Sequence, residues 1–498
     1  MHMNDVILTA LSLPLLQASE TSLPDSNVPV ERPAGEIGDL SVDIVDVRLE
    51  DGRTVQVESG SLLVPERRAA PDSAAVALPF YRIPSTAEAP APPVFLLAGG
   101  PGSSWLEQFE NVDHHADVMR LAEACDVVLF DQRGAGRARP RLDPIGEPRR
   151  LPADEPFDVD RWGEEMREMS AACRDYWTAR GVDLDGYTTA ESAADVDALR
   201  EALGYERISL LGGSYGSHLA LAVMKRHPQR LHRVVLHGVE GLDHTWDDPA
   251  GRLRALERIA ADVESSERYR GSIPEGGLLA ALRSAIEELE REPVVARTRR
   301  GVDVVVDAQL LRMVAGFQAG RKSRPDVWPR MILEAAEGDW STVAEGALAL
   351  RRMRLDRPMH YMMDCASGIS PARRARYASD PARALLGDVN MEYEHVCPAW
   401  DAPDLGDAFR AAPRCDVPTL VIHGTWDTKT PIENAGEVVE ALPDATFVEV
   451  IRGGHGALYD LYRQWPEGRA AVLRFLAGED VAFPPSVELP SPYLDEAR

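Results

Sequence analysis

Short apolar runs recur along the chain and alternate with segments whose apolar residues have helical spacing. Runs of the kind expected for buried strands lie at 93–97, 126–130, 208–211, 419–422 and 446–451. Each run leads into a turn rich in glycine or polar residues, which is typical of parallel strands connected by helices. The pattern predicts an α/β fold with a mostly parallel central sheet flanked by helices.

A different pattern precedes these runs. Residues 45–49 and 55–57 alternate strictly between apolar and polar positions, and Asp51-Gly52 between them is a hairpin turn signal. We therefore expect a β-rich N-terminal extension that packs on the edge of the main sheet.

The run at 208–211 leads into the pentapeptide Gly212-Gly213-Ser214-Tyr215-Gly216, and a helix-compatible segment at 219–224 follows it. A G-x-S-x-G turn between strand and helix is the setting of a nucleophile elbow, because glycine tolerates the strained backbone that such a tight turn requires. The serine then lies at the N-terminal end of a helix, where free N–H groups favour an oxyanion. Ser214 is the candidate nucleophile.

Two later strand ends supply candidate partners for this serine. Asp427 follows the run at 419–422, and His455 follows the run at 446–451 between glycines. The chain order serine, aspartate, histidine is that of the α/β-hydrolase fold. His455 would accept the proton of the serine hydroxyl, and Asp427 would orient the imidazole and stabilise its cation.

Other residues compete for these roles. His423 lies at a strand end before the acid, so His455 is favoured as the base. His218 follows the nucleophile by one helical turn and is interpreted as a helix-face residue. Surface charges are predicted for Asp416 and Glu433, and a loop for the pair His114-His115, which has no partner at metal-ligand spacing. We predict no metal site.

The run at 93–97 ends in a glycine cluster, Ala98-Gly99-Gly100-Pro101-Gly102. A cluster of this kind after an early strand can present N–H groups to an acyl oxygen, and the residue after the nucleophile supplies the other donor. We assign Gly99, Gly100 and the N–H of Tyr215 to the oxyanion hole. A phosphate-binding loop is disfavoured because no G-K-[ST] follows, and we predict no cofactor.

With the glycine cluster, the segment D-Q-R-G-A-G-R at 131–137 resembles the H-G-G-P-G and D-Q-R-G-x-G-x-S motifs of the proline iminopeptidase family of α/β-hydrolases. The tripeptidyl aminopeptidase branch of that family is similar in two further places. These are Tyr215 after the serine, and Tyr187-Thr188-Thr189 before a helix that carries Asp195 and Asp197. The resemblance runs from about residue 62 to the end of the chain, with gaps, and implies a serine peptidase.

The chain departs from the family pattern at two positions. Ala98 stands where the family usually has histidine, and Ala138 where it usually has serine. Neither change removes a residue of the Ser-Asp-His triad or an oxyanion N–H group. Both put the local hydrogen bonding, and hence the choice of substrate, in question.

Asp427 lies more than 200 residues after Ser214, far more than the core fold requires. We attribute the excess to an inserted helical cap, because 252–263, 278–290, 308–319 and 343–354 have helical spacing. The predicted organisation is a flexible N-terminal segment or remnant signal at 1–36, the first part of the hydrolase core at 37–239, the cap at 240–412 and the second part of the core at 413–498. Cap helices commonly shape the substrate pocket and exclude water.

The chain of 498 residues has a net charge of −27. Such a charge argues against binding to nucleic acid or anionic membranes, which needs basic patches. An acidic cap could receive the α-ammonium group of a peptide, and Glu240 and Asp364 are candidates for that role. For each of them, a solvated surface charge is the favoured interpretation.

The five cysteines are too sparse for a disulfide scaffold and are not spaced for zinc. One must stay unpaired, and Cys365 with Cys397 is the expected disulfide if the compartment is oxidising. Residues 6–16 are apolar enough for a signal peptide but too short for stable membrane insertion, and they lack a preceding basic residue. Exported and cytoplasmic locations both fit, and the family resemblance favours export.

The leading functional hypothesis is a serine aminopeptidase of the proline iminopeptidase or tripeptidyl aminopeptidase type. It would cleave short peptides from a free N-terminus through an acyl-enzyme on Ser214. The alternative is a carboxylesterase acting on small esters with the same triad, because fold and triad do not fix the acyl substrate. A non-catalytic binding protein is disfavoured by the complete triad, and an epoxide hydrolase would need aspartate at position 214.

Overall fold

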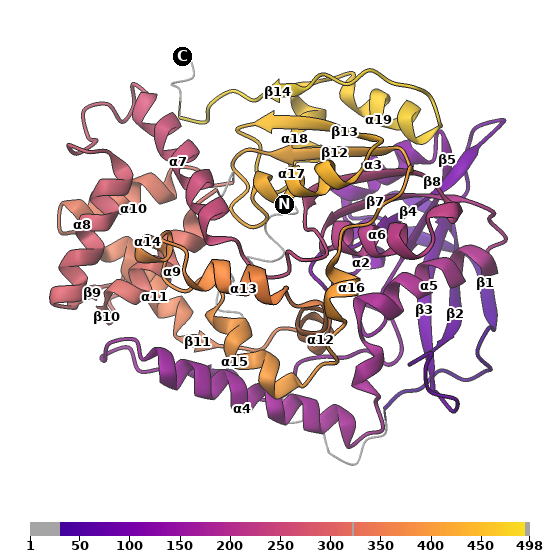
Figure 1. Ribbon diagram of the computed structural model, residues 1–498, viewed down its shortest axis with the longest axis horizontal. Helices are drawn as coiled ribbons and strands as arrows, with labels where there is room; N and C mark the ends of the chain where they lie inside the picture. Colours follow the sequence, from indigo (N-terminus) through magenta and orange to yellow (C-terminus); the bar gives the residue numbers. More distant parts are fainter. Residues whose placement is uncertain (1–29, 321–322, 494–498) are drawn as a thin grey trace.

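The computed structural model describes residues 30–320 and 323–493, so the apolar stretch at 6–16 lies outside the described residues. A sheet of ten strands runs through the molecule in the order β1-β2-β3-β5-β4-β7-β8-β12-β13-β14 (Figure 1). The strands are β1 Leu40–Arg48, β2 Thr54–Pro65, β3 Ala75–Ile83, β4 Ala91–Leu97, β5 Cys125–Phe130, β7 Ile208–Ser214, β8 Leu231–Val239, β12 Thr419–Gly424, β13 Ala445–Ile451 and β14 Ser486–Glu488. All five predicted buried strands are among them.

The sheet is mostly parallel, as the apolar runs predicted. Neighbouring strands from β5 through β14 pair in parallel. The first three strands are antiparallel to their neighbours and join the sheet through β3, where Phe80 pairs with Phe130. The predicted N-terminal β extension is therefore present and forms one edge of the main sheet.

Helices cover both faces of the sheet. One face packs against α5 (Thr189–Ala202), α6 (Tyr215–Arg226) and α17 (Ile432–Ala441). The other packs against α2 (Trp105–Phe109), α3 (Val112–Leu121), α18 (Ala457–Gln464) and α19 (Gly468–Leu476). The loop predicted at His114-His115 is wrong, since both residues lie in α3. Both are buried because their rings pack against aromatic side chains, His114 on Trp105 and Tyr459, and His115 on Phe109.

Between β8 and β12 the chain forms a separate helical layer (Figure 1). Its elements are α7 Pro249–Ser265, α8 Leu278–Arg291, β9 Val294–Arg297, β10 Asp303–Val306, α9 Ala308–Gln318, α10 Val327–Ala336, α11 Ser341–Leu350, β11 Arg352–Met353, α12 Pro358–Ser367, α13 Pro371–Ala378, α14 Arg383–Leu386, α15 Met391–Trp400 and α16 Gly406–Arg410. The four helices predicted by periodicity are present. The last of them ends early because Arg352 and Met353 pair as a strand with β6.

The helical layer also includes segments that precede the nucleophile elbow at Ser214 in the sequence. The strand β6 (Arg149–Arg150) and the long helix α4 (Val159–Thr178) precede Ser214 in sequence. Figure 1 shows α4 along the lower edge of this layer, beneath α15, and side chains of α4 share one hydrophobic cluster with the cap helices. The short 3-10 helices at Leu184–Gly186 and Pro228–Arg230 complete the described elements. Residues 37–239 therefore contribute to both layers.

Candidate active site

Ser214 is the last residue of β7 and directly precedes α6, which begins at Tyr215. Its φ of 55° lies in the left-handed region, a conformation that costs a non-glycine residue roughly 1–3 kcal/mol. The flanking glycines are required by close contacts. A Cβ at Gly212 would collide with the carbonyl of Gly216, and a Cβ at Gly216 with the carbonyl of Leu97. The pentapeptide thus forms the strand–turn–helix elbow that its sequence predicted.

The glycine cluster after β4 packs directly on this serine. A Cβ at Gly99 would lie 3.2 Å from the Cβ of Ser214, and Gly100 has a φ of +117° that favours glycine. Tyr215 is the first residue of α6, so its N–H has no acceptor within the helix. The three residues predicted for the oxyanion hole therefore lie around Ser214.

The D-Q-R-G segment at 131–134 forms hydrogen bonds that stabilise the loops next to the glycine cluster. Gln132 donates from Nε2 to the carbonyl of Ala98 at 3.1 Å and so holds the start of the glycine cluster. Arg133 is fully buried and forms a bidentate pair with Asp195 at 2.7 Å for each contact. Ala98 and Ala138 are themselves buried and apolar. The motifs that carried the resemblance therefore fix the loops around the serine.

Asp427 and His455 lie together at the ends of β12 and β13. Oδ2 of Asp427 is 2.8 Å from Nδ1 of His455, which donates to it. Oδ1 of the same carboxylate accepts from the backbone N–H groups of Lys429 at 2.9 Å and Thr430 at 3.1 Å. This arrangement fixes the tautomer of His455 and leaves its Nε2 for a substrate-side proton.

Strand β8 lies between β7 and β12 and brings these groups to one place. Ser214 pairs with Val239 across the strands, and the residue before Val239 is Gly238. A Cβ at Gly238 would lie 3.1 Å from the imidazole ring of His455, so only glycine leaves room for that ring. The three residues predicted as the triad therefore all follow strands at the carboxyl edge of the sheet, where α/β proteins bind their ligands.

The electrostatics of Asp427 suit an ionised partner for a histidine. Burial by itself would raise the pKa of this carboxyl. The charge of His455 and the hydrogen bonds from His423 and His455 outweigh burial and hold the pKa of Asp427 well below its usual range. Asp427 is therefore negatively charged at every working pH.

His423, the competing base, is engaged elsewhere. Its Nδ1 accepts from the N–H of Val239 at 3.0 Å, and its Nε2 donates to the carbonyl of Thr430 at 2.7 Å. The ring is fully buried, so neither nitrogen can exchange a proton with a substrate. These contacts favour His455 as the base and give His423 the task of anchoring the loop that carries Asp427.

Three further side chains of this region have different surroundings. Asp416 is exposed, as predicted. Glu433 is a charge at the surface, as predicted, but it is only partly exposed and pairs with Arg254 and Arg258 of α7 at 2.7 Å. His218 lies on α6 as predicted but is fully buried, and its ring stacks on that of Tyr215.

Glu240 and Asp364 are both buried, with 9% and 4% of their surface exposed. Their favoured interpretation as solvated charges is therefore wrong, because the cap closes over them. Glu240 directly follows Val239, the strand partner of Ser214, and its N–H donates to Ser217 Oγ at 2.9 Å. The charge of Asp364 acts on Glu240, so the two carboxyl groups form one acidic cluster beside the elbow.

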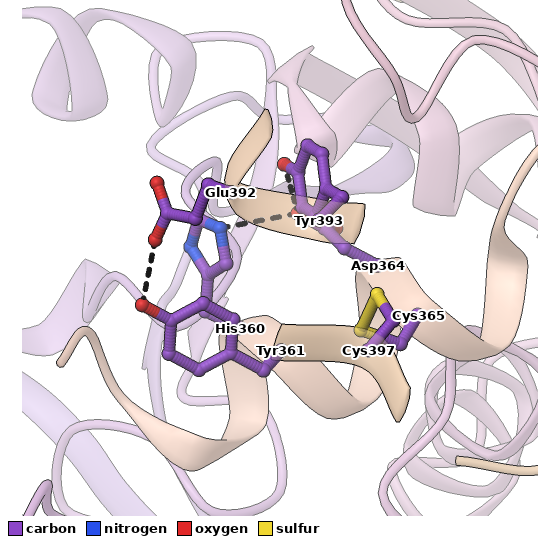
Figure 2. The surroundings of a disulfide bond; sticks show 7 residues. All are labelled: His360, Tyr361, Asp364, Cys365, Glu392, Tyr393 and Cys397. Atoms are coloured by element: carbon purple, nitrogen blue, oxygen red, sulfur yellow. Dashed lines mark hydrogen bonds and ion pairs between the residues drawn. A yellow bond between two sulfur atoms is a disulfide. The ribbon is translucent and has the colours of Figure 1, made fainter. Parts of the chain in front are cut away.

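Asp364 comes from α12 and is held by neighbours on α12 and α15, shown in Figure 2. Its Oδ2 accepts from the hydroxyl of Tyr393 at 2.9 Å and lies 3.1 Å from Nε2 of His360. The predicted disulfide Cys365–Cys397 is present and joins the same two helices, one residue after Asp364. Cys125, Cys173 and Cys415 are free and buried.

The sequence reasoning missed two residues of this site. Thr430 donates from Oγ1 to Oδ2 of Asp427 at 2.8 Å and lies 3.2 Å from Nδ1 of His455. His360 was missed although the sequence carries a signal for it, the i,i+4 spacing of Asp356, His360 and Asp364 on one helix face. No comparable local signal marks Thr430.

Metal-binding clusters and membrane-spanning helices are both absent from the described part of the chain. Over residues 30–320 and 323–493 no group of three or more histidine, cysteine or acidic residues is placed to hold a metal ion. Within the same ranges no helix has the length and apolar character needed to cross a membrane.

Comparisons with known proteins agree with the fold and the motifs. A profile of the alpha/beta hydrolase fold matches residues 92–270, and one described as TAP-like protein matches residues 383–464. The proline iminopeptidase of Xylella fastidiosa is 25% identical over 365 residues, which span 73% of this chain and 83% of that protein. Serine protease Hip1 of Mycobacterium tuberculosis is 25% identical over 422 residues, which span 77% of this chain and 78% of that protein.

Among solved structures, that of a thermophilic esterase from Thermogutta terrifontis covers 84% of this chain and 98% of its own at 16% identity, with a TM-score of 0.35. From the family matches and the relatives, the chain is a serine hydrolase with the α/β-hydrolase fold. The resemblance to its proline iminopeptidase and tripeptidyl aminopeptidase-like members is confirmed.

Proposed function

We propose that this protein is a serine aminopeptidase that cleaves short peptides from a free N-terminus through an acyl-enzyme on Ser214. The observation that carries the proposal is the acidic cluster beside the elbow. Glu240 follows the strand partner of Ser214, and the charge of Asp364, on α12 of the cap, acts on Glu240. Two buried carboxyl groups beside a nucleophile suit an α-ammonium group and do not suit the acyl chain of a neutral ester.

In the proposed mechanism, His455 accepts the hydroxyl proton of Ser214 as Oγ attacks the scissile carbonyl. Asp427 stabilises the resulting imidazolium through the 2.8 Å contact to Nδ1. The N–H groups at Gly99 or Gly100 and at Tyr215 bind the oxyanion. His455 then gives its proton to the leaving amine, and a water molecule that it activates frees the acyl group.

The position of the acidic cluster also bears on the size of the acyl group. Neighbouring strands of a sheet are about 4.8 Å apart, and Glu240 lies one residue beyond the partner of Ser214. A substrate amine bound at Glu240 is therefore only a short distance from the attacked carbonyl. We propose that one or a few residues are removed at a time, within a cap formed by residues 240–412 together with α4.

The Cys365–Cys397 disulfide supports a working place in an oxidising compartment, because such bonds persist outside the reducing cytosol. The proposed partners are therefore small peptides met after export. A carboxylesterase acting on small esters is the alternative that the same triad allows.

The test begins with a fluorophosphonate probe on the wild-type protein and on the Ser214→Ala variant. The proposal expects labelling that depends on Ser214, and cleavage of alanyl, prolyl or trialanyl p-nitroanilides that N-acetylation suppresses. Absence of Ser214-dependent labelling would remove the nucleophile assignment. Turnover of p-nitrophenyl butyrate with no turnover of any amide would replace the peptidase with the esterase.

A further inference from the structure

The two carboxyl groups of the acidic cluster have unlike surroundings. Asp364 receives a hydrogen bond from Tyr393 and an ion pair from His360. Among the described residues, none donates a hydrogen bond to the carboxyl oxygens of Glu240, whose nearest ionisable partner is Nδ1 of His218 at 3.5 Å. Glu240 is also more than nine-tenths buried.

His218 cannot supply the missing positive charge. Its Nδ1 donates to the carbonyl of Gly241 at 3.0 Å, and its Nε2 lies 3.1 Å from the hydroxyl of Ser367. Burial lowers the pKa of His218 to about 4, so the ring stays neutral near pH 7.

The positively charged side chain of this region is His360, and it pairs with Asp364. His360 lies between two carboxylates of its own helix, 3.1 Å from Asp364 and 3.4 Å from Asp356. Burial alone would lower the pKa of His360, but these two negative charges outweigh burial and raise it to about 10. Asp364 therefore has a counter-ion of its own, and its charge acts on Glu240.

We propose that Glu240 carries a proton in the empty pocket while Asp364 is ionised, and that binding of a substrate α-ammonium expels this proton to solvent. The inference rests on the proposed function and assigns different roles to the two acids. The balance is simple: R–NH₃⁺ and the Glu240 carboxylic acid give an ammonium–carboxylate pair and one free proton. Burial and the charge of Asp364 both raise the pKa of Glu240.

The groups that face Glu240 come from three parts of the chain. They are His218 and Tyr215 of α6, Asp364 and His360 of α12, and Asp247 of the loop after β8. Asp364 and Asp247 favour the protonated acid, and His360 favours the carboxylate. Because two negative groups oppose one positive group, the pocket retains the proton until an ammonium group arrives.

The consequence is a pH dependence of binding rather than of the chemical step. Below the pKa of Glu240, protons compete with the ammonium group, so KM for a free amine rises up to about tenfold for each unit by which pH falls. Above about pH 8 a peptide amine loses its own proton, and affinity falls again. An N-acetylated substrate has no ammonium group and should lack the acid side of this profile.

The test is calorimetric titration of the Ser214→Ala protein with trialaninamide at about pH 6, where the peptide amine is fully protonated. Running the titration in two buffers of different ionisation enthalpy gives the number of protons released. We expect about one proton per ligand bound, and about none in the Glu240→Gln variant, which should also bind more weakly. Glu394→Gln, on an exposed part of α15, is the matched control and should release as many protons as the parent.

Two further variants distinguish proton exchange from a merely structural role of the cluster. Asp364→Asn removes the charge that holds the proton on Glu240, so the midpoint of the pH profile of KM should move to lower pH. His360→Gln removes the opposing cation and should move the midpoint to higher pH. Shifts in opposite directions are not expected from loss of folding, which would lower activity in both.

The outcomes separate the inference from the proposed function. If neither trialaninamide nor its N-acetyl derivative binds, or both bind equally, the proposed function fails. If only the free amine binds but no proton is released at any pH between about 5 and 7, the proposed function stands and the role of Glu240 is wrong.

Discussion

Thr430 donates its hydroxyl to Oδ2 of Asp427 at 2.8 Å, the same oxygen that accepts from His455. The threonine therefore helps to fix the carboxylate oxygen that the imidazole contacts. Thr430→Val keeps the shape of the side chain but removes this bond. Because hydrogen bonds to charged groups contribute about 1.5–3 kcal/mol, we expect kcat to fall about 10- to 100-fold with little change in KM.

Steady-state kinetics on a free tripeptidyl p-nitroanilide measure this effect. Thr430→Ser retains the hydroxyl and should keep most of the activity. Thr428→Val is a matched control, because within the described part of the chain the hydroxyl of Thr428 bonds only to the carbonyl of Ala319. Equal kcat for the valine and serine variants at position 430 would show that the hydroxyl has no part in catalysis.

His423 and His455 should respond differently to substitution. His423→Leu would leave the N–H of Val239 and the carbonyl of Thr430 buried without partners, each at a cost of about 1–3 kcal/mol. We expect a drop of about 2–5 kcal/mol in the free energy of unfolding, measured by urea denaturation. His455→Ala should remove activity with little loss of stability, and the reverse pattern would make His423 the base.

The Cys365–Cys397 disulfide closes a loop with a sequence separation of 32 residues. In the chain-entropy description such a crosslink contributes about 3–4 kcal/mol. The Cys365→Ser/Cys397→Ser double variant should lose stability of that order, seen as a lower Tm. Because Asp364 adjoins Cys365, KM for free amines should rise more than KM for p-nitrophenyl esters, and an equal rise for both would contradict a link to amine binding.

Buried histidines predict loss of stability in mild acid. Burial lowers the pKa of His218 to about 4, so between pH 6.5 and about 4 only the unfolded chain takes up a proton. Stability should therefore fall as pH falls through this window, by at most about 1.4 kcal/mol per pH unit for this group. In denaturation curves His218→Gln should flatten the slope, and an unchanged slope would contradict the assignment.

His360 should have the opposite effect in the alkaline range. Its folded pKa is raised to about 10, so the stability that it contributes is full below about pH 6.5 and is lost as pH rises toward 10. His360→Gln should therefore alter the alkaline side of the stability profile and leave the acid side unchanged. A change confined to the acid side would mean that His360 is neutral in the folded protein.

Local signals were enough to locate the main elements of this molecule. Each of Ser214, Asp427 and His455 follows a short apolar run at a turn with its own glycine or proline signal, and parallel strands carry such ends to one edge. The strand predictions succeeded for the same reason. The hairpin of β1 and β2 was visible because apolar and polar residues alternate beside its turn, where burial follows the same alternation over 45–48 and 54–57.

Features that depend on packing between distant segments could not be predicted from such local sequence signals. The sequence around Glu240 and Asp364 looks like a pair of ordinary acids, and only the closure of α12 over the elbow buries them. His114 and His115 look like a polar pair, yet aromatic neighbours from two helices, α2 and α18, pack against them. The participation of α4 in the helical layer likewise follows from contact with α15, far away in sequence.

The central claim is that a free N-terminus is recognised by the acids beside Ser214. Its most direct test is kcat/KM for trialanyl p-nitroanilide and for its N-acetyl derivative, measured on the wild-type protein and on a Glu240→Gln/Asp364→Asn double variant. We predict a preference of about 100-fold or more for the free amine in the wild type, as expected for two charge-assisted contacts, and its collapse toward unity in the double variant. Equal kcat/KM for both substrates in the wild type, or a preference that survives in the double variant, would contradict the claim.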